Sequence, residues 1–242
     1  MKQPRRMWYD ESMPPQRARI VEVFSSLQGE GLRLGERQIF VRFGGCNLRC
    51  DYCDEPASRS ASAGSVWSAA KLKAKILALQ RASGALRNRS ISWTGGEPLL
   101  FPKFLREMMA WAKRKGFGNH LETNGLLPAR LKSLAEFVDV VSMDIKLPSA
   151  TGRNTWGAHG ASLRIVPAKT FVKVVMTASS RLDELRKVIK TLKDMPEMPL
   201  ILQPATGRAI PPKRALAFFK FARSRRKNVR LMRQWHPIWG VR

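Results

Sequence analysis

The segment Phe40–Asp54 reads Phe-Val-Arg-Phe-Gly-Gly-Cys-Asn-Leu-Arg-Cys-Asp-Tyr-Cys-Asp. It begins as an apolar stretch typical of a buried strand, and its two glycines then allow the backbone to turn and to approach a bulky group closely. All the cysteines of the chain lie in this segment, at Cys46, Cys50 and Cys53. Three thiolates from one loop can hold three irons of a cubane cluster and leave the fourth iron open to an outside ligand.

A zinc site is the alternative interpretation of these thiols. Structural zinc normally takes four protein ligands, so a histidine would have to complete the set, and the chain offers His120, His159 and His236. The chain has no second Cys-x-x-Cys pair at a distance, which is the pattern typical of zinc. Three clustered cysteines also make no disulfide framework, so the pattern favours an iron–sulfur cluster in a reducing compartment.

Apolar stretches of strand type recur along the chain, and several of them precede a segment of helical period. Six strands are predicted, at Ile39–Phe43, Ile91–Thr94, His120–Thr123, Val138–Asp144, Phe171–Met176 and Leu200–Gln203. Helices are predicted at Ser68–Arg81, Pro102–Lys115, Ala129–Phe137, Ser180–Leu192 and Pro212–Arg225. This alternation predicts an α/β fold with a parallel sheet, in which ligands bind at the carboxyl ends of the strands.

The chain carries 44 Lys and Arg against 18 Asp and Glu, a formal net charge of +26. The basic residues are spread over the whole chain, with clusters at 113–115 and 223–230, which favours a solvated basic surface and leaves contact with nucleic acid open. Because no apolar run of about 18 residues and no secretory signal is found, we expect a cytoplasmic protein. We also expect a polar leader at residues 1–17, a small-residue loop at 57–65 and a single domain over 18–242.

Four further motifs lie where predicted strands end. They are Trp-Thr-Gly-Gly-Glu-Pro at 93–98, Glu-Thr-Asn-Gly at 122–125, Ser-Met-Asp-Ile-Lys at 142–146 and Gln-Pro-Ala-Thr at 203–206. Glycines allow close approach of the backbone to a ligand, and an acid and a base two residues apart share one face of a strand. Taken alone, each motif is also consistent with a turn, a local ion pair or a loop entry.

The cysteine spacing, with the aromatic Tyr52 before the last cysteine, resembles the signature of the radical S-adenosylmethionine (SAM) superfamily. The resemblance implies a modified, partial TIM-type (β/α) barrel of about six parallel strands. It also implies a [4Fe–4S] cluster whose open iron binds the methionyl group of SAM, which one electron then splits to give a carbon radical. The implied cofactor contacts are Tyr52, Asp54, Gly95, Gly96, Glu97, Glu122, Asn124, Ser142, Met143, Asp144, Lys146, Gln203, Pro204, Ala205 and Thr206.

A narrower resemblance, to the 7-carboxy-7-deazaguanine synthase family, runs from about Val21 to the C-terminus and adds Ser-Leu-Gln-Gly-Glu-Gly at 26–31 to the motifs above. It implies a carbon–nitrogen lyase of queuosine and 7-deazapurine biosynthesis. The enzyme would convert 6-carboxy-5,6,7,8-tetrahydropterin to 7-carboxy-7-deazaguanine with loss of ammonia, as a homodimer served by an electron donor such as flavodoxin or ferredoxin. The implied substrate contacts are Leu27, Gln28, Gly29, Glu30, Arg42, Thr94, His236 and Arg242.

Two positions depart from the family pattern. Glu55 stands where the family has a threonine that helps to bind magnesium, which makes Glu55 the candidate Mg²⁺ ligand and leaves magnesium dependence open. The tail, residues 234–242, brings two tryptophans and a terminal arginine to the region that closes the pocket.

Two other functions remain as alternatives. One is a radical enzyme that acts on a glycine of a partner protein, which would need an open groove. The other is a non-enzymatic basic metal-cluster protein that binds nucleic acid, which would bind RNA in a salt-dependent way.

Overall fold

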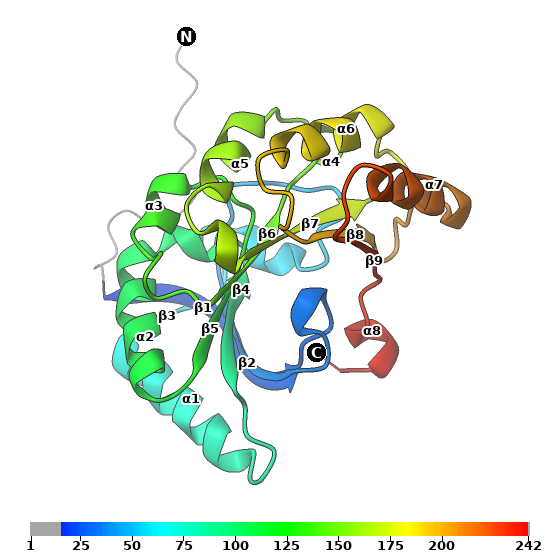
Figure 1. The fold of residues 1–242 in the computed structure, drawn as a ribbon. Helices are drawn as coiled ribbons and strands as arrows, with labels where there is room; N and C mark the ends of the chain where they lie inside the picture. Colours follow the sequence, from blue (N-terminus) through cyan, green and yellow to red (C-terminus); the bar gives the residue numbers. More distant parts are fainter. Residues whose placement is uncertain (1–15, 242) are drawn as a thin grey trace.

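The computed structural model describes residues 16–241, which form one sheet flanked by helices (Figure 1). The strands are β1 Arg17–Leu27, β2 Arg37–Phe43, β3 Ser65–Ser68, β4 Ser90–Gly95, β5 Gly118–Thr123, β6 Val140–Asp144, β7 Thr170–Met176, β8 Leu200–Pro204 and β9 Val229–Leu231. The α-helices are α1 Ala69–Ala82, α2 Pro102–Arg114, α3 Pro128–Lys132, α4 Pro148–Thr151, α5 Trp156–Leu163, α6 Leu182–Thr191, α7 Pro212–Arg223 and α8 His236–Trp239. Short 3-10 turns are η1 Gly31–Arg33, η2 Pro56–Arg59, η3 Pro98–Leu100 and η4 Pro167–Lys169.

The strand order of the sheet is β3-β1-β2-β4-β5-β6-β7-β8-β9. Neighbouring strands are parallel from β2 to β9, whereas β1 is antiparallel to both β2 and β3. Figure 1 shows α1, α2, α3, α5, α6 and α7 in an arc outside the sheet, while η1 and α8 lie on its inner side. Since β3 and β9 are the two edges, the described chain forms an open, partial (β/α) barrel, as the sequence predicts.

All six predicted strands are confirmed, as β2, β4, β5, β6, β7 and β8. Three strands were not predicted. β1 mixes charged and hydroxyl residues with apolar ones and contains an irregularity between Ile20 and Glu22, so it lacks a regular alternation of apolar residues. β3 and β9 have only four and three residues, too few to carry a pattern. The number of parallel strands is therefore seven rather than six in the described part of the chain.

Several predicted boundaries need correction. Arg17 already begins β1, so the expected leader is one residue too long, and its residues 1–15 lie outside the described residues. α3 ends at Lys132, because the following residues form turns instead of continuing the helix. The expected loop at 57–65 contains all of η2 except Pro56, and also the first residue of β3. α5 was missed because two glycines and a histidine interrupt its apolar pattern.

The core fixes where the strand ends lie. Every residue of β7 is buried, as expected for a parallel strand covered on both faces. The indole of Trp93, in β4, is also fully buried, and its Nε1 donates a 2.9 Å hydrogen bond to Asn119 Oδ1. The Asn119 amide in turn donates to the carbonyl oxygens of Met109 and Phe137, both at 3.0 Å. These hydrogen bonds join β4, β5, α2 and the loop before β6 inside the core, and so fix the strands relative to the helix.

Among the described residues, no helix has the length and apolar character that crossing a membrane requires.

Candidate active site

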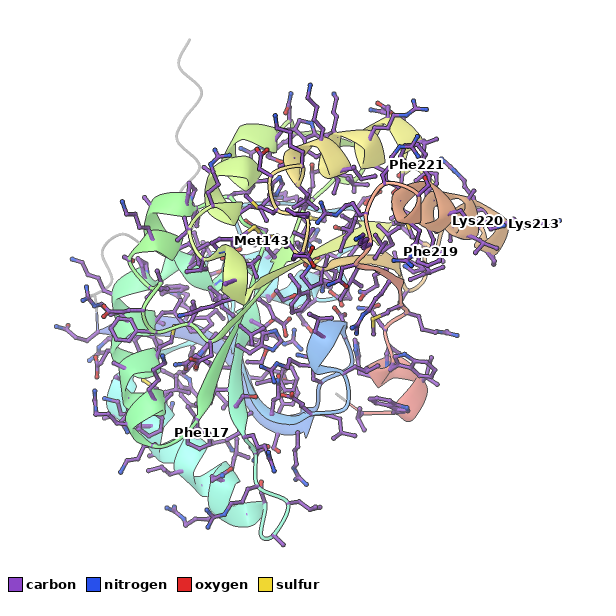
Figure 2. All side chains as sticks on the ribbon, viewed as in Figure 1. Phe117, Met143, Lys213, Phe219, Lys220 and Phe221 are labelled. Atoms are coloured by element: carbon purple, nitrogen blue, oxygen red, sulfur yellow. The ribbon has the colours of Figure 1, made fainter. Side chains whose placement is uncertain are left out.

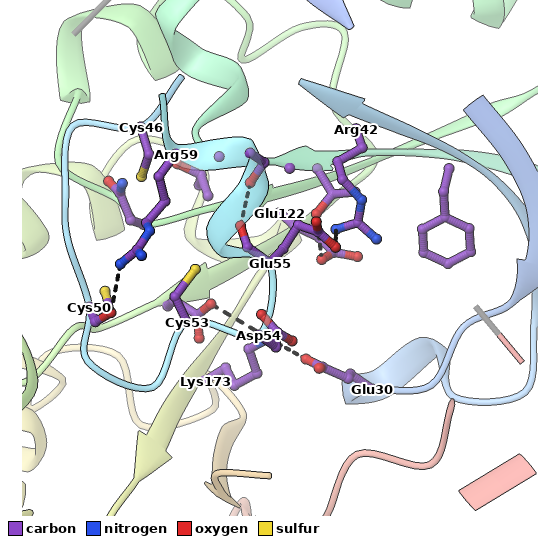
Figure 3. A pocket seen from close by; sticks show the side chains of 18 of the residues that line it. Glu30, Arg42, Cys46, Cys50, Cys53, Asp54, Glu55, Arg59, Glu122 and Lys173 are labelled. Atoms are coloured by element: carbon purple, nitrogen blue, oxygen red, sulfur yellow. Dashed lines mark hydrogen bonds and ion pairs between the residues drawn. The ribbon is translucent and has the colours of Figure 1, made fainter. Parts of the chain in front are cut away.

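A pocket of about 190 Å³ opens at the carboxyl ends of the parallel strands (Figure 3). It gathers side chains from β1, β2 and the loops after them, from the ends of β4, β5 and β6, from the middle of β7, and from α8. All three cysteines face it. Of the predicted substrate residues, those that line it are Leu27, Gln28, Gly29, Glu30, Arg42, Thr94 and His236. Arg242 lies outside the described residues.

Backbone hydrogen bonds hold the cysteine loop in place. Gly45 has a φ of 93°, and its N–H donates to Ser58 O at 2.8 Å, while the N–H of Cys46 donates to Arg59 O at 3.2 Å. The Arg59 guanidinium donates back to Cys50 O at 3.4 Å. The η2 turn therefore supports the loop from behind, and the thiols point into the pocket (Figure 3).

The three thiols fit an iron–sulfur cluster better than a single metal ion. Burial raises the pKa of Cys46 to about 12 and also raises the pKa of Cys50, so these thiolates need a cationic partner. Within residues 16–241, no three His, Cys, Asp or Glu side chains converge as ligands of one ion. A cubane requires only that each thiolate reach a separate iron, which three cysteines around one pocket satisfy.

Gly95 and Gly96 let two loops pass closely. Gly95 has a φ of 118°, a backbone conformation that side chains disfavour. A Cβ on Gly96 would lie 2.0 Å from the carbonyl oxygen of Gly45, a distance that no side chain tolerates. The N–H of Glu97 donates to that same oxygen at 2.8 Å. The glycine pair thus presses the end of β4 against the cysteine loop.

The end of β6 places opposite charges against the cysteine loop. Asp144 Oδ2 lies 3.0 Å from Lys146 Nζ, and the ammonium of Lys146 lies 5.3 Å from the ring centre of Tyr52. Asp144 Oδ1 is buried and has no hydrogen-bond partner among the described residues. An orphaned carboxylate oxygen at a pocket wall is a polar group that a bound cofactor can satisfy.

Lys173 is a pocket residue that the sequence analysis missed. Its ammonium pairs with Glu30 and lies 3.5 Å from Asp144 Oδ2, although it belongs to the buried strand β7. Burial alone would lower the pKa of Lys173, but Asp144, Glu30 and Glu122 raise it, so the side chain is cationic. A lysine within the apolar sequence Phe-Val-Lys-Val-Val was the available signal, because buried lysines are rare unless they are paired.

Gln28 and Glu122 line the pocket and are hydrogen-bonded to each other. Gln28 Nε2 donates to Glu122 Oε1 at 2.9 Å, and Gln28 Oε1 accepts from the N–H of Glu30 at 3.1 Å. Glu122 also accepts hydrogen bonds from Ser92 at 2.8 Å and from Thr94 at 3.1 Å. These bonds fix the orientation of the amide and of the carboxylate before any ligand arrives.

Arg42 is already paired with acids. Its Nε lies 2.7 Å from Glu22 and its Nη1 lies 3.6 Å from Glu55. Glu55, the candidate magnesium ligand, lines the pocket, and its magnesium role stays a prediction. The guanidinium also lies 5.8 Å from the ring centre of Phe24, a second pocket residue that the sequence did not point to.

The C-terminal tail packs over Gly29 and Glu30, which follow β1 and are predicted substrate contacts. The N–H of Trp235 donates to Gly29 O at 3.0 Å, and a Cβ on Gly29 would lie 2.6 Å from His236 Nδ1. Gln234, also missed, donates to Glu30 at 2.5 Å and to Asp54 at 3.0 Å. These contacts link the tail to β1 and to the cysteine loop.

The predicted cofactor residues divide into two groups. The group that lines the pocket is Tyr52, Asp54, Gly95, Gly96, Glu122, Asn124, Asp144 and Lys146. The group that lies off the pocket wall is Glu97, Ser142, Met143, Gln203, Pro204, Ala205 and Thr206.

Glu97 and Thr206 illustrate the second group. Glu97 is fully buried and accepts hydrogen bonds from Leu99 N, Thr123 Oγ1 and Asn124 N, at 3.0, 2.8 and 2.8 Å. The Thr206 hydroxyl bonds to Gln234. The roles of this group stay predictions.

The chain is similar to known proteins in sequence and in fold. The model of the Radical SAM superfamily matches residues 40–195. The chain is 39% identical to 7-carboxy-7-deazaguanine synthase of Methanothermobacter thermautotrophicus over 212 residues, 78% of this chain and 83% of that protein. It is 35% identical to the Geobacter sulfurreducens enzyme of the same name over 245 residues, 92% of this chain and 97% of that protein.

A solved structure, QueE from Escherichia coli, matches with a TM-score of 0.64 and 21% identity over 90% of this chain and 94% of that chain, which supports the fold. By sequence and by the superfamily match, the chain belongs to the 7-carboxy-7-deazaguanine synthase family of radical SAM enzymes.

Proposed function

We propose that this chain converts 6-carboxy-5,6,7,8-tetrahydropterin to 7-carboxy-7-deazaguanine with loss of ammonia. The observation that carries the proposal is one pocket that joins three thiols to a wall of amide, carboxylate and guanidinium groups. Support also comes from relatives of that name that align over most of the chain. Cys46, Cys50 and Cys53 would hold the [4Fe–4S] cluster, which together with SAM supplies a carbon radical.

The cofactor side of the pocket would be formed by the strand ends. The free oxygen of Asp144 suits a hydroxyl or ammonium donor, and Lys146 beside it suits a carboxylate. Tyr52, in the cysteine loop, contacts Lys146 through its ring and would help to keep water away from the bound cofactor.

The substrate side would bind a flat, polar ring that carries a carboxylate. Glu30 and Glu122 can accept hydrogen bonds from ring N–H groups, and Gln28 can serve as donor or acceptor. Arg42 is the natural partner of the substrate carboxylate, because guanidinium grips carboxylate in a bidentate way. Since Glu55 lies 3.6 Å from Arg42, substrate binding would have to displace that contact or bridge the two carboxylates with a cation such as Mg²⁺.

The small pocket favours this function over the alternatives. A radical enzyme acting on a partner protein would need an open groove, whereas the tail here contacts the substrate segment through Trp235, Gln234 and His236. A metal-cluster protein without enzymatic activity would have no use for the close passage of Gly96 beside the cysteine loop.

The proposal also includes a cytoplasmic homodimer that receives electrons from a flavodoxin or ferredoxin. Light scattering during gel filtration tests the dimer, because a monomer at micromolar concentration would contradict it.

The activity is tested with anaerobically reconstituted protein, reductant, SAM and the carboxytetrahydropterin, with and without magnesium. Mass spectrometry should detect 7-carboxy-7-deazaguanine, and Cys50→Ala should lose both cluster iron and product. Release of 5′-deoxyadenosine without the ring-contracted product would refute the assigned substrate.

A matched pair of arginine variants locates the substrate side. Arg42→Lys keeps the positive charge but loses the two parallel N–H donors of the guanidinium, so we expect at least a tenfold rise in KM for the pterin. Arg33→Lys, at an exposed pair with Glu36, should leave KM unchanged. Equal KM values in the two variants would remove Arg42 from the substrate site.

A further inference from the structure

A second hollow, of about 640 Å³, lies between α6 and α7, and none of its residues lines the pocket described above. Figure 1 shows these two helices side by side at the outer margin of the fold. Figure 2 shows Lys213 and Lys220 of α7 projecting from that margin. The exposed cations around the hollow are Arg186, Lys190, Lys193, Arg225 and Lys227.

A buried arginine, Arg226, connects the two loops beside the hollow. Arg226 is 7% exposed, and its guanidinium donates to the carbonyl oxygens of Leu192, Met195 and Met198 at 2.8, 2.7 and 2.8 Å. The loop after α6 is thereby tied to the loop after α7. Because Arg226 is held in this way, the neighbouring basic residues keep their places around the hollow.

The ring of Phe221 contacts two of these arginines, Arg186 and Arg225. The Arg225 guanidinium lies 3.8 Å from the ring centre of Phe221, and the Arg186 guanidinium lies 5.5 Å from it. Two guanidinium groups thus lie beside one ring that lines the hollow.

The charges of this surface are not balanced by acids. Residues 223–230 read Arg-Ser-Arg-Arg-Lys-Asn-Val-Arg and include no acid, and Glu197 is the single acid that lines the hollow. Within residues 16–241, no exposed cation around the hollow forms an ion pair. By contrast, Lys73, Arg106 and Lys113 on α1 and α2 pair with acids. Among the described residues, the hollow therefore gathers five exposed, unpaired cations around a single acid.

We propose that this hollow binds the phosphodiester backbone of single-stranded RNA, independently of the proposed lyase reaction. Cations spread over two helices and a loop match a chain of phosphates better than one phosphate. The guanidinium planes held on Phe221 offer stacking surfaces for unpaired bases. An acidic membrane fits less well, because helices that lie in a membrane surface insert apolar side chains beside their cations, and no exposed large apolar residue of the described chain lines the hollow.

The test compares two triple variants of the full-length, reconstituted protein with the same change in net charge. The hollow variant carries Lys190→Glu, Lys193→Glu and Lys227→Glu. The control variant carries Lys75→Glu, Lys103→Glu and Lys115→Glu, at exposed positions on or next to α1 and α2. Circular dichroism and iron content check that both triples fold.

Binding is measured by fluorescence anisotropy with a labelled single-stranded RNA of about 20 nucleotides, at several salt concentrations. We expect the hollow variant to bind at least tenfold more weakly, and the slope of log K against log salt to fall by about 2. The control variant should stay within about threefold of the parent protein. Equal weakening by the two triples would assign the binding to overall charge and overturn the proposal.

Two further outcomes would also overturn the proposal. One is RNA binding that neither triple changes. The other is loss of binding to phosphatidylserine vesicles by the hollow variant with unchanged RNA binding, which would assign the surface to membranes. A milder variant, Lys190→Gln with Lys193→Gln, should give an intermediate loss of RNA affinity.

Discussion

Replacing Lys173 with methionine removes the buried charge that joins Glu30 to Asp144 at the end of β6. The Lys173 side chain is 8% exposed and pairs with Glu30 and Asp144, and methionine keeps its apolar stem without the ammonium. We expect Lys173→Met to lower the free energy of unfolding by about 3 to 5 kcal/mol, because removing one partner of a buried pair strands the other.

The magnitude follows from the surroundings of Glu30. Burial alone would raise the pKa of Glu30, but the charge of Lys173 and hydrogen bonds from Lys173 and Gln234 lower it from 4.5 to about 2. That change corresponds to about 3 kcal/mol at about 1.4 kcal/mol per pKa unit. Asp144 keeps Lys146 at 3.0 Å, so Glu30 is the carboxylate that the substitution strands.

Urea unfolding at neutral pH, followed by tryptophan fluorescence, measures this loss. The control is Lys113→Met, which breaks a half-exposed pair with Asp139 at 3.1 Å and should cost less than about 1 kcal/mol. Adding Glu30→Gln to Lys173→Met should recover part of the loss, because the stranded charge is gone. Equal losses in the two methionine variants, or no recovery in the double variant, would show that Lys173 does not stabilise the fold by neutralising Glu30.

Three other predictions follow from single contacts. The pKa of Glu30 is lower in the folded state, so its contribution to the free energy of unfolding is complete above about pH 4.5 and is lost as the pH falls towards 2. Glu30→Gln should therefore make the free energy of unfolding less dependent on pH between these values, as measured by urea unfolding at each pH. Gly96→Ala should lower the free energy of unfolding by at least about 2 kcal/mol and reduce bound iron, because the new Cβ would overlap the carbonyl of Gly45. Gly157→Ala, whose new Cβ meets no neighbour within 4 Å, should be neutral or stabilising in urea unfolding. Equal effects of the two changes would contradict the close contact between Gly96 and the cysteine loop. Glu55→Thr should make product formation more dependent on magnesium, and an unchanged magnesium titration would exclude Glu55 from the metal site.

Local patterns explain which elements could be predicted. The strands β6, β7 and β8 are largely apolar and are bounded by turn residues, so their sequence alone indicates that they are buried. The parallel order then follows from the alternation with helices, and it brings the motifs at strand ends to one edge. β1 escaped prediction because its partners, not its own composition, make it a strand: it pairs with β2 on one side and with β3 on the other.

The pocket residues that were missed depend on contacts between distant parts of the chain. Lys173 and Glu30 are 143 residues apart, and Gln234 and Glu30 are 204 residues apart. No local pattern links such positions, because their contact requires the sheet to be complete and the tail to be docked.

The cysteine loop, the parallel strands and the family could be recognised without a structure, because thiol spacing, apolar periodicity and glycine turns act over a few residues. Which charges neutralise one another in the pocket, and which stay unpaired between α6 and α7, depends on the folded chain. A charge is stabilised by the groups within a few ångströms of it, and packing brings those groups together from every part of the chain.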